Sequence, residues 1–209
     1  LQSFDDYCER MNDNQPCYYY LTGQSLNSVS KSPHLKRIIN DYEVILFTDA
    51  IDEYMIGKID SWKDKKFVDL AKDEVDFGES DEIKKEKEET TKQYEEFGKF
   101  IKTVIGTQLS SVSFDTTINT DSMITSGNYG WSANMTRIMN SQALGDNKMS
   151  QFMTNQKKLI LNPNKSLVKK LYNGWTIQPD NETLHHGLQL LYESSLLENR
   201  TFSYSAIIL

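Results

Sequence analysis

A run of charged residues at positions 79–96 constrains the fold of this chain more than any other feature. It holds eight acidic and four basic residues, and Ile83 is its only aliphatic residue. A run of mixed charge cannot form a core face, and it is usually a solvated helix or a linker. We therefore predict a boundary near Gly78, with one domain over residues 1–78 and a second over residues 79–209.

The segment before this boundary alternates between strand and helix patterns. Three short apolar or aromatic runs, of the kind that forms buried strands, occupy residues 17–22, 43–48 and 66–71. Ser32 and Pro33 supply a helix cap and a first-turn proline between the first two runs, and residues 51–59 have a further helical pattern. The order strand, helix, strand, helix, strand predicts a small parallel sheet covered by helices.

The segment after the boundary has a mixed pattern. An apolar stripe from Tyr94 to Ile105 predicts one long helix that begins polar in the charged run, becomes buried and stops at Gly106. Further strands are expected at residues 109–118, 123–125 and 159–161, and further helices at residues 131–144, 166–172 and 182–197. The expected fold class is α/β and α+β, a small helix-covered parallel-sheet domain followed by a mixed α/β domain that ends in dimerisation helices.

The last predicted helix has a broad leucine face. Leu184, Leu188 and Leu191 recur at helical spacing, and Leu190 and Leu197 lie alongside them. A face this broad exceeds what one neighbouring surface in a small domain requires, so the pattern favours a partner helix. The candidate residues for contact with this partner helix are Leu184, Leu188, Leu191, Leu197, Ile207 and Ile208.

The composition limits the possible partners. A net charge of −7 disfavours binding to a nucleic-acid backbone, because that affinity depends on clustered Lys and Arg. A membrane partner is disfavoured because no stretch approaches the roughly 20 apolar residues of a spanning helix. Cys8 and Cys17 lie close together near one end, where a disulfide would do little to stabilise a chain of 209 residues. Their placement favours a reducing compartment.

Side chains that could perform chemistry are few. His34, His185 and His186 have no third partner at zinc spacing, and the chain has no Gly-rich phosphate loop. Asp49, Asp52 and Glu53 form an acidic cluster that a small α/β hydrolase would use for acid/base catalysis. Their simpler role is to cap the helix that begins near Ile51, since acids favour the positive end of a helix. We expect no catalytic residue, no metal site and no cofactor in this chain.

A stripe of tryptophan and methionine is the most unusual feature of the second segment. Trp131, Met135 and Met139 recur at i, i+4 and i+8, and Met149 and Met153 form a similar pair nearby. Methionine is flexible and polarizable, so an exposed stripe of it can pack against many apolar partners. Spacing alone favours an ordinary core position for such a stripe.

At these residues the chain resembles the family of heat-shock protein 90 chaperones. Residues 129–135 match the family segment Tyr/Phe-Gly-Trp-Ser/Thr-Ala-Asn-Met, and residues 142–144 match the Gln-Ala-Leu that ends the following helix. Further matches in the same order lie at residues 5–7, 10–11, 18–19, 22–23, 31–33, 51–54, 162–163 and 190–193. The resemblance covers the end of the middle domain and the C-terminal dimerisation domain of that family.

This resemblance implies a V-shaped homodimer in which the last helices of two copies pack as a four-helix bundle. It also implies that unfolded client proteins contact Trp131, Met135, Met139 and Met149. ATP and Mg²⁺ would bind outside this chain, in the full-length protein, and co-chaperones are possible partners. The Ala133-Asn134 pair resembles cytosolic members, so a cytoplasmic location is expected.

The chain also departs from the family pattern. Thr136, Asn140 and Gly145 stand where relatives carry charged residues, and Ala50 stands where a proline is usual. These differences leave a divergent dimeric scaffold without chaperone activity as the alternative function.

Overall fold

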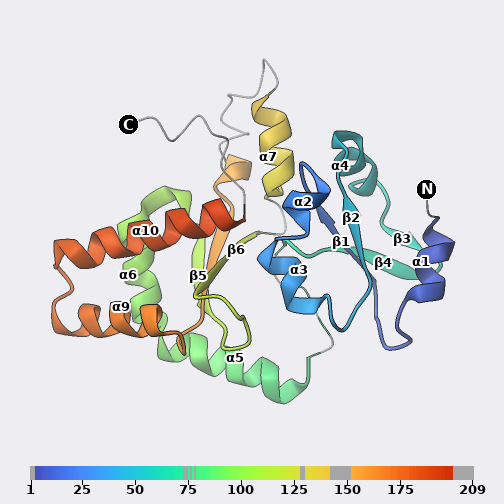
Figure 1. The fold of residues 1–209 in the computed structure, drawn as a ribbon. Coiled ribbons are helices and arrows are strands. Elements are labelled where there is room, and N and C mark those ends of the chain that lie inside the picture. Colours follow the sequence, from blue (N-terminus) through green and yellow to red (C-terminus); the bar gives the residue numbers. More distant parts are fainter. Residues whose placement is uncertain are drawn as a thin grey trace.

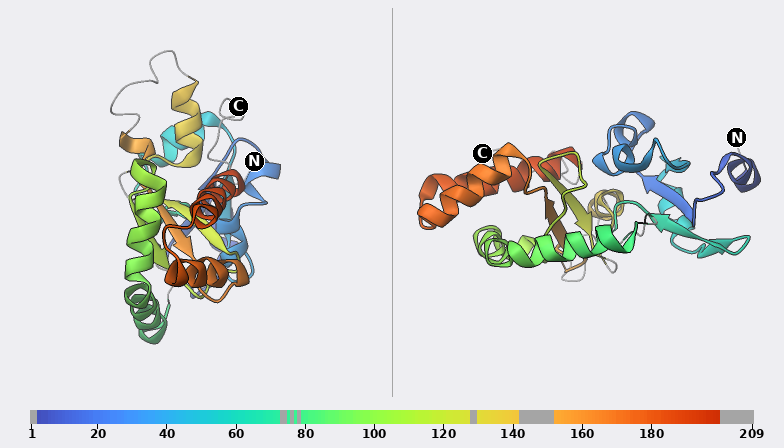
Figure 2. Two further views of the ribbon diagram at one scale, coloured as in Figure 1. Left: turned by 90° about the vertical axis from the view of Figure 1, so that its left-hand side faces the viewer. Right: turned by 90° about the horizontal axis from the view of Figure 1, so that it is seen from below.

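The computed structural model of the chain describes residues 3–72, 75, 77, 79–127, 130–141 and 152–199 (Figure 1). These residues form two β-sheets, a four-stranded one within residues 18–69 and a three-stranded one within residues 111–161. Each sheet has its own hydrophobic core, and the two cores share no residue. Figure 2, in its right-hand view, shows the two sheets side by side along the long axis of the molecule. The mixed α/β class predicted from the sequence is confirmed, and the boundary near residue 78 stays a prediction.

The first sheet has the strand order β2-β1-β4-β3. Its three longer strands, β1 (Tyr18–Thr22), β2 (Val44–Phe47) and β4 (Lys65–Asp69), are parallel, as predicted. The fourth, β3 (Ser61–Trp62), pairs antiparallel with β4 through a two-residue turn at Lys63 and Asp64. Both turn residues have positive φ, which matches the twist that tight hairpins require. This hairpin was not predicted, because a two-residue strand has no detectable period.

Four short helices accompany the first sheet: α1 (Phe4–Arg10), α2 (Leu26–Val29), α3 (Pro33–Ile38) and α4 (Ala50–Ile56). Serine side chains cap the first three. Ser3 Oγ accepts a hydrogen bond from Asp6 N at 3.2 Å, and Ser25 and Ser32 cap α2 and α3 in the same way. The core beneath these helices contains Cys17, Tyr19, Leu21, Val29, Ile38 and Leu70.

The charged run forms a separate helix, so the prediction of one long helix is wrong. α5 (Asp81–Gln93) has no buried residue, and α6 (Glu95–Ile105) buries Phe97 and Ile101. The break lies at Tyr94, whose backbone (φ −102°, ψ 13°) leaves helical geometry. The Tyr94 ring stacks on Phe114 with centroids 5.0 Å apart, so packing of this ring accompanies the break. Helix α6 ends at Gly106, as predicted, and this glycine has φ +80°. A 3₁₀ turn (Gly106–Gln108) follows.

In the second sheet, the strand that comes last among the described residues lies between the two earlier ones. Its order is β5-β7-β6, with β7 (Lys157–Leu161) parallel to β5 (Ser111–Phe114) and antiparallel to β6 (Ser122–Ser126). Helices α6, α9 (Ser166–Ile177) and α10 (Glu182–Glu198) cover one face and share its core. Helix α7 (Ala133–Asn140) stands beside α4 (Figure 1).

Within the described ranges, none of the helices combines the length and the apolar character needed to cross a membrane.

Candidate functional site

The base of α7 is fixed to α4 by a buried polar cluster. Asn134 Nδ2 donates to Glu53 Oε2 at 2.9 Å, and Ser132 Oγ donates to Glu53 Oε1. Glu53, Ser132 and Asn134 are all at least nine-tenths buried. Asn134 Oδ1 also accepts from Arg137 Nη2 at 2.9 Å. A buried carboxylate that accepts two side-chain hydrogen bonds holds both donors firmly. If either bond breaks, no water is nearby to replace it, so opening the cluster is costly in free energy.

The same cluster sets where α7 begins. Ser132 Oγ accepts from Met135 N at 2.9 Å and is the N-cap, so the helix starts at Ala133. The predicted helix start at Trp131 is therefore wrong, and this residue precedes the cap. The predicted helix end, at residues 142–144, lies outside the described residues.

The stripe of tryptophan and methionine lies outside the core. Asn134, Thr136 and Ile138 face inward and are buried, whereas Trp131, Met135 and Met139 are half-buried. The Tyr54 hydroxyl lies 4.0 Å from Met139 Sδ, which links the stripe to α4. Met149 lies outside the described residues. Spacing alone favoured a core position for the stripe, but the polar residues Asn134 and Thr136 are buried on α7 instead.

Exposed apolar side chains on α4 lie next to this stripe. Ile51, Tyr54 and Met55 are 70%, 41% and 38% exposed. They recur at i, i+3 and i+4, so they share one face of the helix. The sequence analysis did not include them in the site, although this spacing could have identified them.

The acidic cluster at the start of α4 is not assembled as a catalytic group. Asp49 is the N-cap, and Asp52 Oδ2 accepts from Asp49 N at 3.0 Å. The Glu53 carboxylate instead accepts hydrogen bonds from the side chains of Ser132 and Asn134. Capping is therefore confirmed for the first two acids, and the third has a structural role that the sequence analysis did not foresee.

The leucines of α10 are divided between two environments. Leu184, Leu188 and Leu191 are 6%, 2% and 6% exposed, because they belong to the core formed with α6 and the second sheet. Leu190 and Leu197 are 65% and 50% exposed. Much of the broad leucine face thus serves the core of the same chain, and the part available to a second copy is its outer edge. The interface stays a prediction, and Ile207 and Ile208 lie outside the described residues.

An ion network joins α3 to the second sheet. Arg37 Nη2 lies 3.1 Å from Asp115 Oδ2 and 3.3 Å from Glu79 Oε1, and Lys87 Nζ contacts both carboxylates. Burial alone raises the pKa of Asp115. The hydrogen bonds from Thr117 and the charges of Arg37 and Lys87 outweigh it, so the pKa lies below its ordinary value.

Backbone contacts reinforce this junction. Ser126 N in β6 donates to Ala71 O, just after β4, at 2.8 Å. His34 on α3 is buried nearby, and burial is the main reason that its pKa falls to about 4. The imidazole is therefore neutral near pH 7. We call the region between α3 and β4 on one side and α5 and the second sheet on the other the seam.

No group of three His, Cys, Asp or Glu side chains that could hold a metal ion occurs within the described part of the chain.

Comparison with known proteins gives matches over nearly the whole chain. The model of the family described as "Hsp90 protein" matches residues 1–204. The chloroplastic heat shock protein 90-5 of Arabidopsis thaliana is 33% identical over 201 residues, which cover 95% of this chain and 26% of that protein. An endoplasmin homolog of the same plant is 33% identical over 95% of this chain and 24% of its own length. Heat shock protein 83 of Leishmania donovani is 33% identical over 94% of this chain and 44% of its own length.

The chain spans about a quarter of the length of the first of these relatives. The family model, by contrast, matches all but the last five residues of this chain. The chain therefore belongs to the Hsp90 family.

Proposed function

We propose that this chain is the end of the middle domain and the C-terminal dimerisation domain of an Hsp90 chaperone, and that it contributes client binding and homodimerisation. Membership of the Hsp90 family supports a chaperone role. ATP hydrolysis with Mg²⁺ then belongs to other parts of the full-length protein. The chain itself supplies surfaces and no catalytic group.

The observation that carries the client-binding role is the orientation of α7. Ser132 and Asn134 are bonded to Glu53 at the base of α7, and Trp131, Met135 and Met139 remain partly exposed. Methionine side chains adapt to differently shaped apolar partners at small cost, which suits a surface that binds many unfolded proteins. Because the start of α7 is already held by Glu53, only the flexible side chains become ordered when a client binds. This limits the conformational entropy that is lost on binding.

The client-binding role is tested with the double variant Met135→Gln and Met139→Gln. Glutamine has similar length and helix propensity, so the change removes apolar contact without altering α7. Each half-buried methionine should contribute about 1 kcal/mol to client contact, so loss of both should lower the affinity for a heat-unfolded model client such as citrate synthase about thirtyfold. The measurement is light scattering of the client at graded chain concentrations.

The matched control is Leu167→Gln on α9, which removes an apolar side chain 41% exposed and remote from α7. It should leave protection unchanged. Equal protection by the double variant and the unmodified chain would refute the client-binding role. It would favour the alternative of a dimeric scaffold without chaperone activity.

The homodimer is proposed to form through the outer edge of α10, with Leu190 and Leu197 as its described apolar residues. Burying a leucine side chain contributes about 1.5–3 kcal/mol, so Leu190→Glu with Leu197→Glu should dissociate the dimer. Sedimentation velocity should show a concentration-dependent dimer for the unmodified chain and a monomer for the variant. A monomer at every concentration of the unmodified chain would contradict this part of the proposal.

A cytoplasmic location is proposed on the resemblance of Ala133-Asn134 to cytosolic members. The relatives include proteins named as chloroplastic and mitochondrial, so family membership alone does not decide the compartment. Fluorescence microscopy of the tagged full-length protein tests this, and an organellar signal would overturn it.

A further inference from the structure

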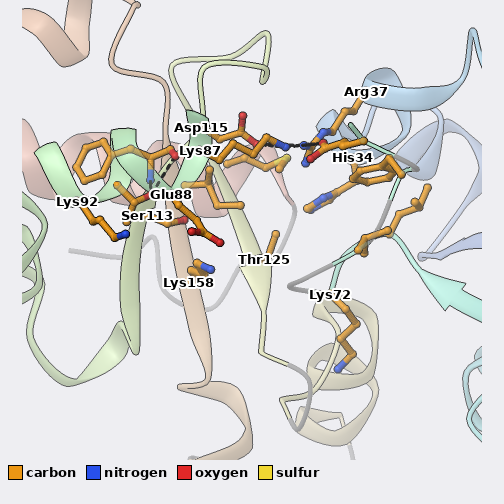
Figure 3. Close-up of a pocket in the computed structure, with 18 residues that line it drawn as sticks. His34, Arg37, Lys72, Lys87, Glu88, Lys92, Ser113, Asp115, Thr125 and Lys158 are labelled. Carbon is orange, nitrogen blue, oxygen red and sulfur yellow. Dashed lines mark hydrogen bonds and ion pairs between the residues drawn. The ribbon is translucent and has the colours of Figure 1, made fainter. Parts of the chain in front are cut away.

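Contacts within the chain occupy the outer edge of β5 in the second sheet. The Thr91 hydroxyl on α5 donates to Phe114 O at 3.2 Å, and its oxygen lies 3.3 Å from Phe114 N, which donates to it. Figure 3 shows Lys87 of α5 next to Asp115, the residue that follows β5, and Lys87 Nζ lies 3.2 Å from Asp115 Oδ2. Helix α5 therefore covers the end of this edge, as is usual for edge strands in natural proteins.

Two of the other three edges are also limited. The end of β6 is occupied, because Ser126 N donates to Ala71 O at 2.8 Å and Lys72 forms a bridge with Ser126. In the first sheet, β3 is an edge strand of only two residues. The opposite edge of that sheet is β2, which has four residues. This strand is therefore the edge to consider for pairing with another chain.

The backbone of β2 has polar groups that no described residue satisfies. Gly23 N donates to Phe47 O at 2.9 Å, so Phe47 directs its backbone groups towards β1. Successive residues of a strand direct these groups to opposite sides, so Ile45 also points towards β1, whereas Val44 and Leu46 point outwards. No hydrogen bond from a described residue reaches the N–H or C=O groups of Val44 and Leu46 on that side. Two donors and two acceptors are therefore open to a further strand.

The side chains of β2 favour an apolar partner. Val44, Ile45, Leu46 and Phe47 include no charge and no proline, the residues that commonly protect an edge strand, and all four are half-buried. Val44 and Leu46 pack against the core of the first sheet. Phe47 packs on Tyr20 on the opposite face, with ring centroids 5.9 Å apart. An added strand with apolar side chains would bury the exposed part of these residues on both faces.

The charges that flank β2 disfavour pairing with a second copy of the chain. Asp41 precedes the strand, Asp49 follows it, and both are exposed. In an antiparallel pair of two β2 strands, the outward groups of Val44 meet those of Leu46 from the second copy. The same register places Asp41 of one copy opposite Asp49 of the other. Like charges directly opposite each other destabilise a pair of strands, so the occupant is a different polypeptide.

The same carboxylates favour a partner strand with basic ends. Residues 38–57 hold five acids and no Lys or Arg. Glu43 is paired with Arg10 at 2.8 Å and Glu53 is bonded to Asn134, whereas Asp41 and Asp49 are exposed at the two ends of the strand. A Lys or Arg at each end of an added strand would meet a carboxylate there.

We propose that the outer edge of β2 binds an extended polypeptide segment with an apolar centre and basic ends, which pairs with Val44 and Leu46 as an added strand. Main-chain hydrogen bonds would supply affinity for many sequences, and the apolar and acidic surroundings would set the preference. This edge is separate from α7. It adds a second contact for an extended segment and does not depend on the client-binding role of α7.

The experiment is amide hydrogen exchange of the ¹⁵N-labelled 209-residue chain, followed by NMR. In the free chain, the outward amides of Val44 and Leu46 should exchange about a hundredfold faster than those of Ile45 and Phe47, which are bonded to β1. The probe is the peptide Ac-KTVTVTVTK-NH₂, which alternates apolar and polar residues between two lysines. Its addition should slow exchange at Val44 and Leu46 in a saturable way and leave Ile45 and Phe47 as they were.

Two further peptides separate the contributions of backbone and charge. The same peptide with N-methyl groups on two adjacent central residues has both of its edges blocked, and it should bind about tenfold more weakly. The acidic counterpart Ac-ETVTVTVTE-NH₂ should also bind about tenfold more weakly, because its ends meet Asp41 and Asp49.

Variants of the chain test the named edge. Val44→Pro removes one outward N–H at the first residue of an edge strand, where proline is tolerated, and affinity for the basic peptide should fall about tenfold. The matched control Val44→Ala keeps this N–H and should bind within about threefold of the unmodified chain. The double variant Met135→Gln and Met139→Gln should bind the peptide as the unmodified chain does, which distinguishes this site from α7.

Slow exchange of Val44 and Leu46 in the free chain would overturn the proposal, because the edge would already be covered. Protection that rises with chain concentration alone would overturn it in favour of a second copy as the occupant. Equal affinity for the basic peptide and its N-methylated form, or loss of peptide binding in the double variant of α7, would also overturn it. If Val44→Pro fails to fold, the comparison of peptides on the unmodified chain still decides the question.

Discussion

The bond between Glu53 and the base of α7 predicts a local loss of stability in the variant Glu53→Gln. Glutamine keeps the volume and one carbonyl oxygen of the side chain. It replaces the other oxygen with an amide group that is itself a donor, so it cannot accept from both Ser132 Oγ and Asn134 Nδ2. One charge-assisted hydrogen bond is lost at a buried site.

The magnitude follows from the burial of all three groups. Hydrogen bonds to charged groups contribute about 1.5–3 kcal/mol, and a donor left alone in a buried site loses its bond without replacement by water. Since Glu53 lies on α4 and its partners lie at the start of α7, the loss should appear as local opening of α7. The rate of amide exchange there should rise about tenfold to a hundredfold.

Hydrogen–deuterium exchange with mass spectrometry measures this directly on peptides that cover residues 131–141. Peptides from α10 should exchange as before, because the hydrogen bonds of Glu53 come from Ser132 and Asn134 at the start of α7. Glu193→Gln, at an exposed position of α10, is the matched control and should change neither region. Unaltered exchange of residues 131–141 in Glu53→Gln would show that the polar cluster does not hold α7, and the account of its orientation would fail.

Three further predictions concern the seam and the core. The pKa of His34 falls from 6.5 to about 4 on folding, so its contribution to stability is complete above pH 6.5 and is lost as pH falls towards 4. Urea unfolding of His34→Phe should show a weaker pH dependence in that window. Asp115→Asn should lower the free energy of unfolding by about 1–3 kcal/mol at pH 7, since the hydrogen bonds from Arg37 and Lys87 lose their charged acceptor. Because the pKa of Asp115 is lowered on folding, this difference should shrink below its ordinary value of 3.8. Leu188→Ala should cost about 2–5 kcal/mol in urea unfolding, because Leu188 is 2% exposed in the core.

Hydrophobic periodicity predicts most of the secondary structure of this chain. The parallel sheet of β1, β2 and β4 and the helix N-caps at Ser3 and Ser32 follow from short-range patterns that depend on neighbouring residues. The strand order β5-β7-β6 does not follow from such patterns, because the insertion of β7 depends on contacts between segments far apart in the sequence. The break at Tyr94 was missed for the same reason. Its ring packs on Phe114 and Tyr172, which local spacing does not place beside it.

The candidate site was predicted in part, and the missing part is polar. Helical spacing is read from apolar residues alone, so it identified Trp131, Met135 and Met139. It also favoured a buried position for their stripe. The structure turns Asn134 and Thr136 inward instead, and Asn134 has its bond partner on a helix eighty-one positions earlier in the chain. A buried polar residue is stable only where a partner meets it, so its direction depends on the assembled fold. The base of α7 is therefore oriented by one carboxylate on α4, and the methionines stay half-buried because Asn134 takes the position that faces this carboxylate.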